Sequence, residues 1–398
     1  MNQRYHSLDN LRGIIMWLGV VLHVCINHMA GVSNIPWRDS QTGEFADILL
    51  LFIHTFRMPA FFILAGFFTA FLLEKSSTRQ MLIHRMKRLA VPFAIFWPIL
   101  LIATMPLMQS FIERTVETPL TKPSADEMSS STITTMHLWF LYYLIWFCLF
   151  GAVIHKITRK LPTSWKEKSS DIFSLIATNW WGVVLLTLPL VAIGSFFKYG
   201  LLDPDTTLIP NVFNLTHNGI YFVFGWLCFY HSNKLFNHYQ RYCWHYVVSG
   251  FVIFMAVMVE FGMVMQGKLG DTQGSIIIAA TYNSISWIWS FALIGIFLRY
   301  LNKPNRVLRY LADSSYWVYL VHMLGTIGFG LILYDTNLSM LPKMLINIVL
   351  TSVVCLITYQ LFVRHTWIGR LLNGPRSTPK EAPTSIDQTP ADGTKSTA

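Results

Sequence analysis

Arginine and histidine side chains stand inside two long apolar runs of this chain, where charge is expensive. Arg57 lies in the run 45–68, and His23 lies in the run 11–29. A guanidinium keeps its proton and costs roughly 2.5–3.5 kcal/mol at the bilayer centre by insertion scales. It therefore faces a partner, a cavity or a substrate, unless it only ties helices together through backbone carbonyls. An imidazole can accept a proton and a guanidinium can stabilise negative charge, which suits chemistry within the membrane.

Helical spacing brings His23 and Arg57 to similar predicted depths. Arg12 and His23 are eleven residues apart, which is about three turns and roughly 16 Å along one helix face. Asn27 follows four residues later on that face. Arg57 is about eleven residues into a run that enters from the opposite side, with His54 on the same face. Taken alone, Arg12 is also typical of a helix-end anchor, and His23 of a helix-packing hydrogen bond.

Other candidate residues lie in three further segments. Arg85 and Arg88 are three residues apart and share a helix face, where two guanidinium groups suit a phosphate. Such basic clusters also serve as topology signals or contacts to anionic lipids. His137 opens the run 137–156 near the predicted outer surface, and His322 lies one to two turns inside the run 316–334. For each of these two histidines, packing and chemistry are equally good explanations.

The elements that position these residues are membrane helices. The 398 residues are 53% hydrophobic and 13% charged, against about 25% charged in soluble domains. A net charge of +10 does not indicate nucleic acid, because the basic residues fall in short loops between apolar runs. We expect an all-α polytopic membrane protein with about ten spans. The predicted spans are 11–29, 46–73, 89–111, 137–156, 180–197, 213–230, 244–265, 275–298, 316–334 and 341–363.

The distribution of basic residues predicts the orientation. One set of alternate segments holds 23 of the 30 Lys and Arg residues, and the other holds 6. By the positive-inside rule both termini are cytoplasmic. We expect residues 1–373 to form one transmembrane domain, and 374–398, rich in Ser, Thr and Pro, to be a disordered cytoplasmic tail.

Several other classes of protein have no support in the sequence. No cleavable signal peptide is evident, and the 5 Cys are scattered without a metal or disulfide pattern. No metal site is expected. The chain lacks the short sequence motifs of hydrolases and of nucleoside triphosphatases.

These segments together resemble the membrane-bound acyltransferase-3 family. The resemblance rests on Arg12 and His23, on 56–62 followed by 65–67, on Arg85 to Arg88, on 137–141 and on 316–322. A departure is Ala65, where the family usually has serine before glycine. Within the family, the stretches 56–62 and 137–144 are most similar to the branch of the glucan biosynthesis protein C, which succinylates osmoregulated periplasmic glucans. Related branches acetylate other envelope glycans or small molecules.

The resemblance implies an acyltransferase, of the class that transfers groups other than aminoacyl groups, in the bacterial inner membrane. Cytoplasmic acetyl-coenzyme A or succinyl-coenzyme A would be the co-substrate, a carbohydrate hydroxyl the acceptor, and no cofactor would be permanently bound. Arg12, Arg85 and Arg88 would then bind the phosphates of the donor. His23 would act as general base or carry the acyl group, and Arg57 would stabilise the thioester oxygen.

Supporting roles on the acceptor side fall to the remaining candidates, which are His137, Tyr319, His322 and Asn27. The alternative is a transporter or flippase for a glycan, lipid or acyl carrier, with no covalent chemistry. The sequence does not reveal the oligomeric state.

Overall fold

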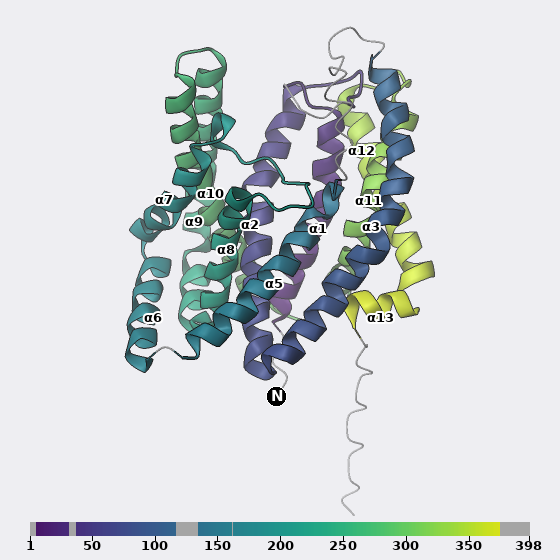
Figure 1. Ribbon diagram of the computed structural model, residues 1–398. Helices are drawn as coiled ribbons and strands as arrows, with labels where there is room; N and C mark the ends of the chain where they lie inside the picture. Colours follow the sequence, from purple (N-terminus) through teal and green to yellow (C-terminus); the bar gives the residue numbers. More distant parts are fainter. Residues whose placement is uncertain (1–4, 32–36, 117–133, 161, 375–398) are drawn as a thin grey trace, which may run out of the picture.

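Every regular element in the described part of the chain is a helix. The computed structural model describes residues 5–31, 37–116, 134–160 and 162–374 (Figure 1). The predicted class, an all-α polytopic membrane protein, is confirmed. The longer helices are α1 (His6–Asn27), α2 (Glu44–Lys75), α3 (Thr78–Val116), α5 (Trp139–Thr158), α6 (Thr163–Thr178), α7 (Trp180–Gly194), α8 (Val212–Tyr230), α9 (Ser232–Met265), α10 (Asp271–Tyr300), α11 (Arg306–Leu333) and α12 (Met340–Thr358). The shorter helices are η1 (Met136–Leu138), η2 (Lys198–Gly200), η3 (Tyr359–Val363) and α13 (Trp367–Asn373).

Among the described helices, 8 are long and apolar enough to cross a membrane, or 9 if the bent pair α6 and α7 forms one span. Each of the ten predicted runs coincides with a helix, but α7 has only 15 residues and α8 is not among the 8. The count of ten spans and the orientation therefore stay predictions. The predicted tail at 375–398 lies outside the described residues.

Several helices extend beyond the apolar runs that predicted them. The run 89–111 belongs to α3, Thr78–Val116, and the run 244–265 belongs to α9, Ser232–Met265. An apolar run marks only the part of a helix that suits hydrocarbon, whereas the helix continues into its polar ends. Arg85 and Arg88 consequently lie on α3.

Helix α1 lies at the centre of the bundle, between α2 and α11 (Figure 1). The side of α2 that faces away from α1 packs closely against α8. A Cβ atom placed on Gly66 would lie 1.9 Å from the carbonyl oxygen of Phe222. Small residues allow such close helix contacts in membrane proteins. The rings of Phe62 and Phe222 both contact Phe147, while Phe71 contacts Phe229. Contacts thus advance along both helices together, so α8 runs parallel to α2.

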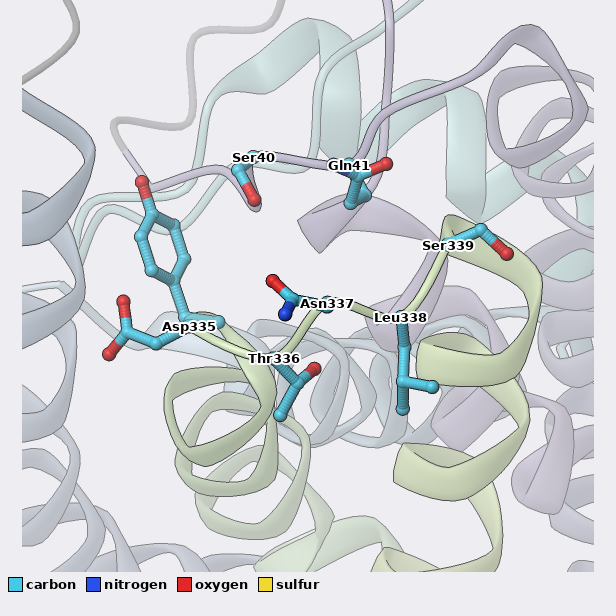
Figure 2. Close-up of a pocket in the computed structure, with 8 residues that line it drawn as sticks. Ser40, Gln41, Asp335, Thr336, Asn337, Leu338 and Ser339 are labelled. Carbon is cyan, nitrogen blue, oxygen red and sulfur yellow. The ribbon is translucent and has the colours of Figure 1, made fainter.

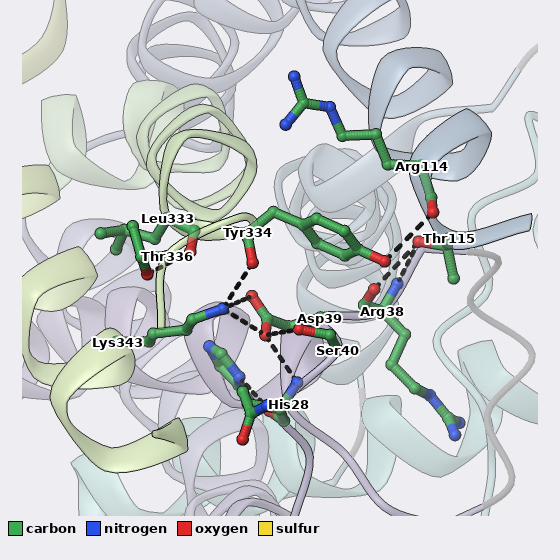
Figure 3. Close-up of polar contacts among 11 residues, drawn as sticks. His28, Arg38, Asp39, Ser40, Arg114, Thr115, Leu333, Tyr334, Thr336 and Lys343 are labelled. Atoms are coloured by element: carbon green, nitrogen blue, oxygen red, sulfur yellow. Dashed lines mark hydrogen bonds and ion pairs between the residues drawn. The ribbon is translucent and has the colours of Figure 1, made fainter. Parts of the chain in front are cut away.

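A buried ion pair closes the end of the bundle where α2 begins. Nζ of Lys343 lies 3.0 Å from Oδ1 of Asp39 and also donates to the carbonyl oxygen of Tyr334, at 2.8 Å (Figure 3). Both side chains are at most 1% exposed. A buried charge is stable when it is paired and hydrogen-bonded. The pair therefore fixes the segment after α1 against the start of α12.

The loop between η2 and α8 is anchored by Asp205. The Tyr143 hydroxyl and the Asn211 amide each donate to its Oδ2 at 2.6 Å, and Thr207 donates to its Oδ1. Burial disfavours the carboxylate, but these hydrogen bonds outweigh it and lower the pKa of Asp205. The backbone of Thr206 accepts from the Thr135 amide at 2.7 Å. The loop is thereby tied to the segment that leads into η1.

Candidate functional site

Three histidines from separate elements meet inside the bundle. His23 comes from α1, His137 from η1 and His322 from α11. The ring centroids of His23 and His322 are 5.0 Å apart, those of His137 and His322 are 5.3 Å apart, and those of His23 and His137 are 6.4 Å apart. We call these three residues the histidine cluster. The spacing of residues in the sequence did not predict that His137 and His322 would lie next to His23.

His322 presents a ring nitrogen with a free lone pair. Its Nδ1 lies 2.9 Å from the carbonyl oxygens of both Val318 and Tyr319. Because carbonyl oxygens only accept, Nδ1 carries the proton and Nε2 is left unprotonated in the neutral ring. Nε2 is buried and has no hydrogen-bond partner among the described residues. The fold thus selects the tautomer that can accept a proton at Nε2.

His137 is held in the complementary way. Its Nε2 lies 3.0 Å from the Leu320 carbonyl oxygen, so Nε2 donates and Nδ1 is left with a lone pair. Nδ1 is buried without a partner within the described part of the chain. The hydroxyl of Tyr319 donates to the backbone carbonyl of His137 at 2.9 Å. The preceding Met136 has a φ of 51°, a left-handed conformation that is uncommon for a methionine.

His137 is buried within the protein. Its side chain is only 7% exposed and lies in the histidine cluster, and its expected position near the outer surface of the membrane stays a prediction. The segment 134–138 is anchored to Thr206 of the loop ahead of α8. This anchoring, between residues about 70 positions apart, is not visible in an apolar run.

Arg57 lies beside the histidine cluster and is 7% exposed. Its Nε donates to the Ile15 carbonyl oxygen of α1 at 3.2 Å. A side chain on Gly19 would lie 2.5 Å from Nη2 of Arg57 and 3.6 Å from Nε2 of His322. The guanidinium and the free nitrogen of His322 therefore lie over the same glycine. The expectation that Arg57 and His23 lie at one level agrees with this geometry, because His23 is one turn from Gly19 on α1.

The ring of His23 is the least constrained of the three. Its Nδ1 is buried and has no hydrogen-bond partner in the described structure, yet the residue is partly exposed. Buried polar atoms are normally paired, and unpaired ones require an explanation such as a ligand or water. The histidine cluster contains three such atoms, one on each ring. Together with Arg57 it has the groups to accept a proton and to stabilise an oxyanion.

The predicted basic residues form a second group at the other end of α2, which we call the basic cluster (Arg12, Arg85 and Arg88). Arg12 repels both Arg85 and Arg88 electrostatically. Nε and Nη2 of Arg85 are buried without a hydrogen-bond partner among the described residues. Arg88 donates to the Asn373 carbonyl at 2.6 Å, and Arg12 lies 3.5 Å from Asp9. Unpaired buried guanidinium donors suit an anion.

The Asn27 side chain is buried and forms a hydrogen bond between helices. Its Nδ2 donates to the Thr326 carbonyl of α11 at 3.0 Å, and Asn347 of α12 donates to the same oxygen at 2.9 Å. These bonds tie α1, α11 and α12 together. The Asn27 side chain is 1% exposed.

A polar group on the far side of Arg57 was not predicted from the spacing of residues in the sequence. Nδ1 of His54 lies 2.7 Å from the Tyr282 hydroxyl, and Nε2 of His217 lies 2.9 Å from Oδ1 of Asn283. The several polar residues in the middle of the apolar run 275–298 are a signal that could have indicated it. Asp205 was missed as well, although Asp-Thr-Thr in a loop is typical of side chains that bond the local backbone.

An open polar pocket of about 450 Å³ lies elsewhere, between the start of α12 and the segment after α1 (Figure 2). It contains none of the predicted site residues and is lined by Ser40, Gln41 and 334–339. No group of three or more His, Cys, Asp or Glu residues suited to a metal occurs within the described ranges.

Comparison with known proteins gives a family match and consistent matches to individual relatives. The family model described as an acyltransferase domain matches residues 5–360. A glucans biosynthesis protein C of Salmonella typhimurium is 22% identical over 402 residues, covering 96% of this chain and 98% of the relative. The protein of that name from Shigella dysenteriae is 23% identical over 390 residues, covering 94% and 95%. No solved structure matches.

Proposed function

Because the chain belongs to the acyltransferase-3 family, we propose that it transfers an acyl group from acyl-coenzyme A to a carbohydrate hydroxyl on the opposite side of a bacterial inner membrane. The observation that carries this proposal is Arg57 and His322 lying over Gly19 beside His23. This arrangement combines a fixed positive charge with proton acceptors in a setting poor in water.

The basic cluster supports the choice of donor. Coenzyme A carries phosphate groups, and Arg85 offers buried donors that lack a protein partner in the described structure. Arg12 and Arg88 add positive charge at the same end of the bundle. The acyl-bearing arm would extend from there along α1 toward His23, roughly 16 Å from Arg12 along the helix axis.

The proposed reaction is nucleophilic substitution at the thioester. The acceptor hydroxyl oxygen forms a bond to the thioester carbonyl carbon while His23 takes the hydroxyl proton. The carbonyl oxygen becomes an oxyanion, which the Arg57 guanidinium stabilises. The carbon–sulfur bond then breaks, and the departing thiolate takes a proton from the imidazolium. In the covalent variant, a nitrogen of the neutral His23 ring attacks the thioester carbon, the carbon–sulfur bond breaks, and the thiolate takes the proton from the other ring nitrogen. The acceptor hydroxyl oxygen then attacks the acyl-imidazole, and the departing imidazole takes the hydroxyl proton.

The acceptor class comes from the relatives. Proteins named glucans biosynthesis protein C align with nearly the whole chain. We propose that the acceptor is a glucan or another envelope glycan and that the acyl group is acetyl or succinyl. The enzyme itself is a multi-pass membrane protein.

The test is acceptor-dependent release of coenzyme A by the purified, folded protein. Acetyl- and succinyl-coenzyme A would be supplied with glucose oligosaccharides of defined linkage. We expect the wild type to release coenzyme A only when the oligosaccharide is present, and His23→Ala to reduce kcat by about 10²-fold or more. His155→Ala, on the half-exposed end of α5, is the matched control and should retain activity.

Two outcomes would contradict the proposal. Full activity of His23→Ala would exclude the proposed role of that ring. Transport of the oligosaccharide across proteoliposomes without any coenzyme A release would favour the transporter alternative.

A further inference from the structure

A second buried polar group joins α2, α8 and α10 on the side of Arg57 away from the basic cluster. His54 of α2 pairs with Tyr282 of α10, and His217 of α8 pairs with Asn283 of α10. His54 precedes Arg57 by three residues on α2, which is about one helical turn. The proposed chemistry at the histidine cluster uses none of these four side chains.

Each of the two histidines keeps one ring nitrogen for another partner. Nδ2 of Asn283 donates to the Ala279 carbonyl at 2.8 Å, so its Oδ1 accepts from Nε2 of His217. Nδ1 of His217 therefore has a free lone pair. Nε2 of His54 likewise has no protein partner in the described structure, because its Nδ1 is the atom bonded to Tyr282.

These free nitrogens are not fully enclosed by protein atoms. His54 and His217 are both partly exposed, although each lies deep among protein atoms. Neither free nitrogen is among the buried unpaired atoms of the described residues. A ligand that reaches Arg57 from the end where α2 begins would pass them, because α8 runs parallel to α2 and His217 lies in its second turn.

The chemistry of the group selects a neutral, hydroxyl-bearing ligand. The polar groups that act on His54 are the Tyr282 hydroxyl, Arg57 and His217, and His217 bonds Asn283. Among the described residues, no carboxylate acts on either ring. Imidazole nitrogens, a phenol and an amide offer both donors and acceptors, which a sugar needs, whereas a phosphate needs the cations found at the basic cluster.

We propose that His54 and His217 form a subsite that binds hydroxyl groups of the carbohydrate acceptor next to Arg57. The inference rests on the proposed function and deepens it, since it places acceptor and donor on opposite sides of the reacting centre. The alternative is a purely structural role, in which the pair only links three helices through hydrogen bonds. This alternative predicts that a substitution lowers thermal stability and leaves the acceptor KM unchanged.

The experiment compares His217→Leu with His217→Gln in the full-length protein, using a glucose oligosaccharide as acceptor. We expect His217→Leu to raise the acceptor KM about 5- to 10-fold, with an unchanged donor KM. Glutamine offers an amide donor and a carbonyl acceptor, so His217→Gln should recover much of the loss. The matched control is His238→Leu, since His238 makes a comparable 3.0 Å bond to the Tyr246 hydroxyl on α9. It should leave the acceptor KM unchanged.

A drop in thermal stability with no change in acceptor KM would overturn the subsite and establish the structural role. Direct binding of the same oligosaccharide, followed by saturation-transfer NMR, provides a readout that does not need turnover. Binding that is unaffected by His217→Leu would also overturn the inference. A wild-type protein that binds the oligosaccharide at His217 but releases no coenzyme A would instead contradict the proposed function while retaining the subsite.

Discussion

His23 and His322 lie side by side across the contact between α1 and α11, with ring centroids 5.0 Å apart. One ring has its tautomer fixed by two backbone carbonyls, and the other is free of such bonds at Nδ1. His322 is a fixed proton acceptor at Nε2, and the neighbouring His23 ring is unconstrained at Nδ1. This arrangement suits the transfer of a proton, because only His23 has to change its hydrogen bonds.

The first prediction concerns His322. Replacing it by alanine removes the fixed acceptor at Nε2, and we expect kcat to fall by about 10²-fold, the lower range for a group that takes part in proton transfer. The measurement is coenzyme A release at saturating donor and acceptor. A ring that only packs would affect thermal stability and leave kcat near the wild-type value. His231→Ala, whose ring bonds Ser170 at 3.0 Å, serves as the matched control.

The second prediction concerns the basic cluster. Arg85→Glu replaces buried unpaired donors with an acceptor of the same charge as a phosphate. We expect the donor KM to rise by about 10-fold or more, since hydrogen bonds to charged groups contribute about 1.5–3 kcal/mol each. Arg79→Glu makes the same charge change on an exposed residue of α3 and should have little effect. A change confined to the acceptor KM would mean that the donor and acceptor sides are reversed.

Some of this site is predictable from sequence because helical periodicity is a local property. The spacing of eleven residues from Arg12 to His23 predicts that they share one helix face, and the cost of a buried guanidinium makes Arg57 a candidate site residue. The same reasoning gives the helical fold, because an apolar run in a membrane has to satisfy its backbone internally.

Other parts of the site depend on contacts between distant segments. The tautomer of His137 is set by Leu320, which is 183 residues away, and no spacing in the sequence reports it. Lys343 resembles an ordinary loop lysine in the sequence, yet it is fully buried against Asp39. Polar residues that pair across helices are hidden for the same reason, as with His217 and Asn283.

The third prediction concerns pH and the loop anchored by Asp205. The pKa of this carboxyl is lowered in the folded protein, so the unfolded chain binds more protons in acid. Its contribution to stability is complete above its ordinary pKa and is lost as pH falls through the lower, folded value. We expect Asp205→Asn to reduce the free energy of unfolding by about 1–3 kcal/mol near pH 6.

The difference between wild type and Asp205→Asn should shrink as the pH is lowered below the ordinary pKa. Thermal unfolding followed by tryptophan fluorescence at several pH values measures it. Asp203→Asn lies in the same loop on an exposed residue and should show neither the loss nor the pH dependence. A constant difference at all pH values would show that the ionised form of Asp205 is not what anchors the loop.

The last prediction separates catalysis from stability at Gly19. A Cβ at this position would lie 2.5 Å from Nη2 of Arg57, the far end of a flexible side chain that can move aside at small cost. Gly19→Ala should therefore leave thermal stability near the wild-type value, while alanine's higher helix propensity offsets part of the strain. The displaced guanidinium would no longer face the developing oxyanion, and a shift of about 1 Å can reduce the rate by about 10²-fold. Gly262→Ala in α9 is the matched control, because nothing lies within 4 Å of its Cβ. If Gly19→Ala keeps full kcat, the position of Arg57 over this glycine is not required for the reaction. If it instead unfolds the protein, the contact is part of helix packing, and the role assigned to Arg57 loses its strongest geometric support.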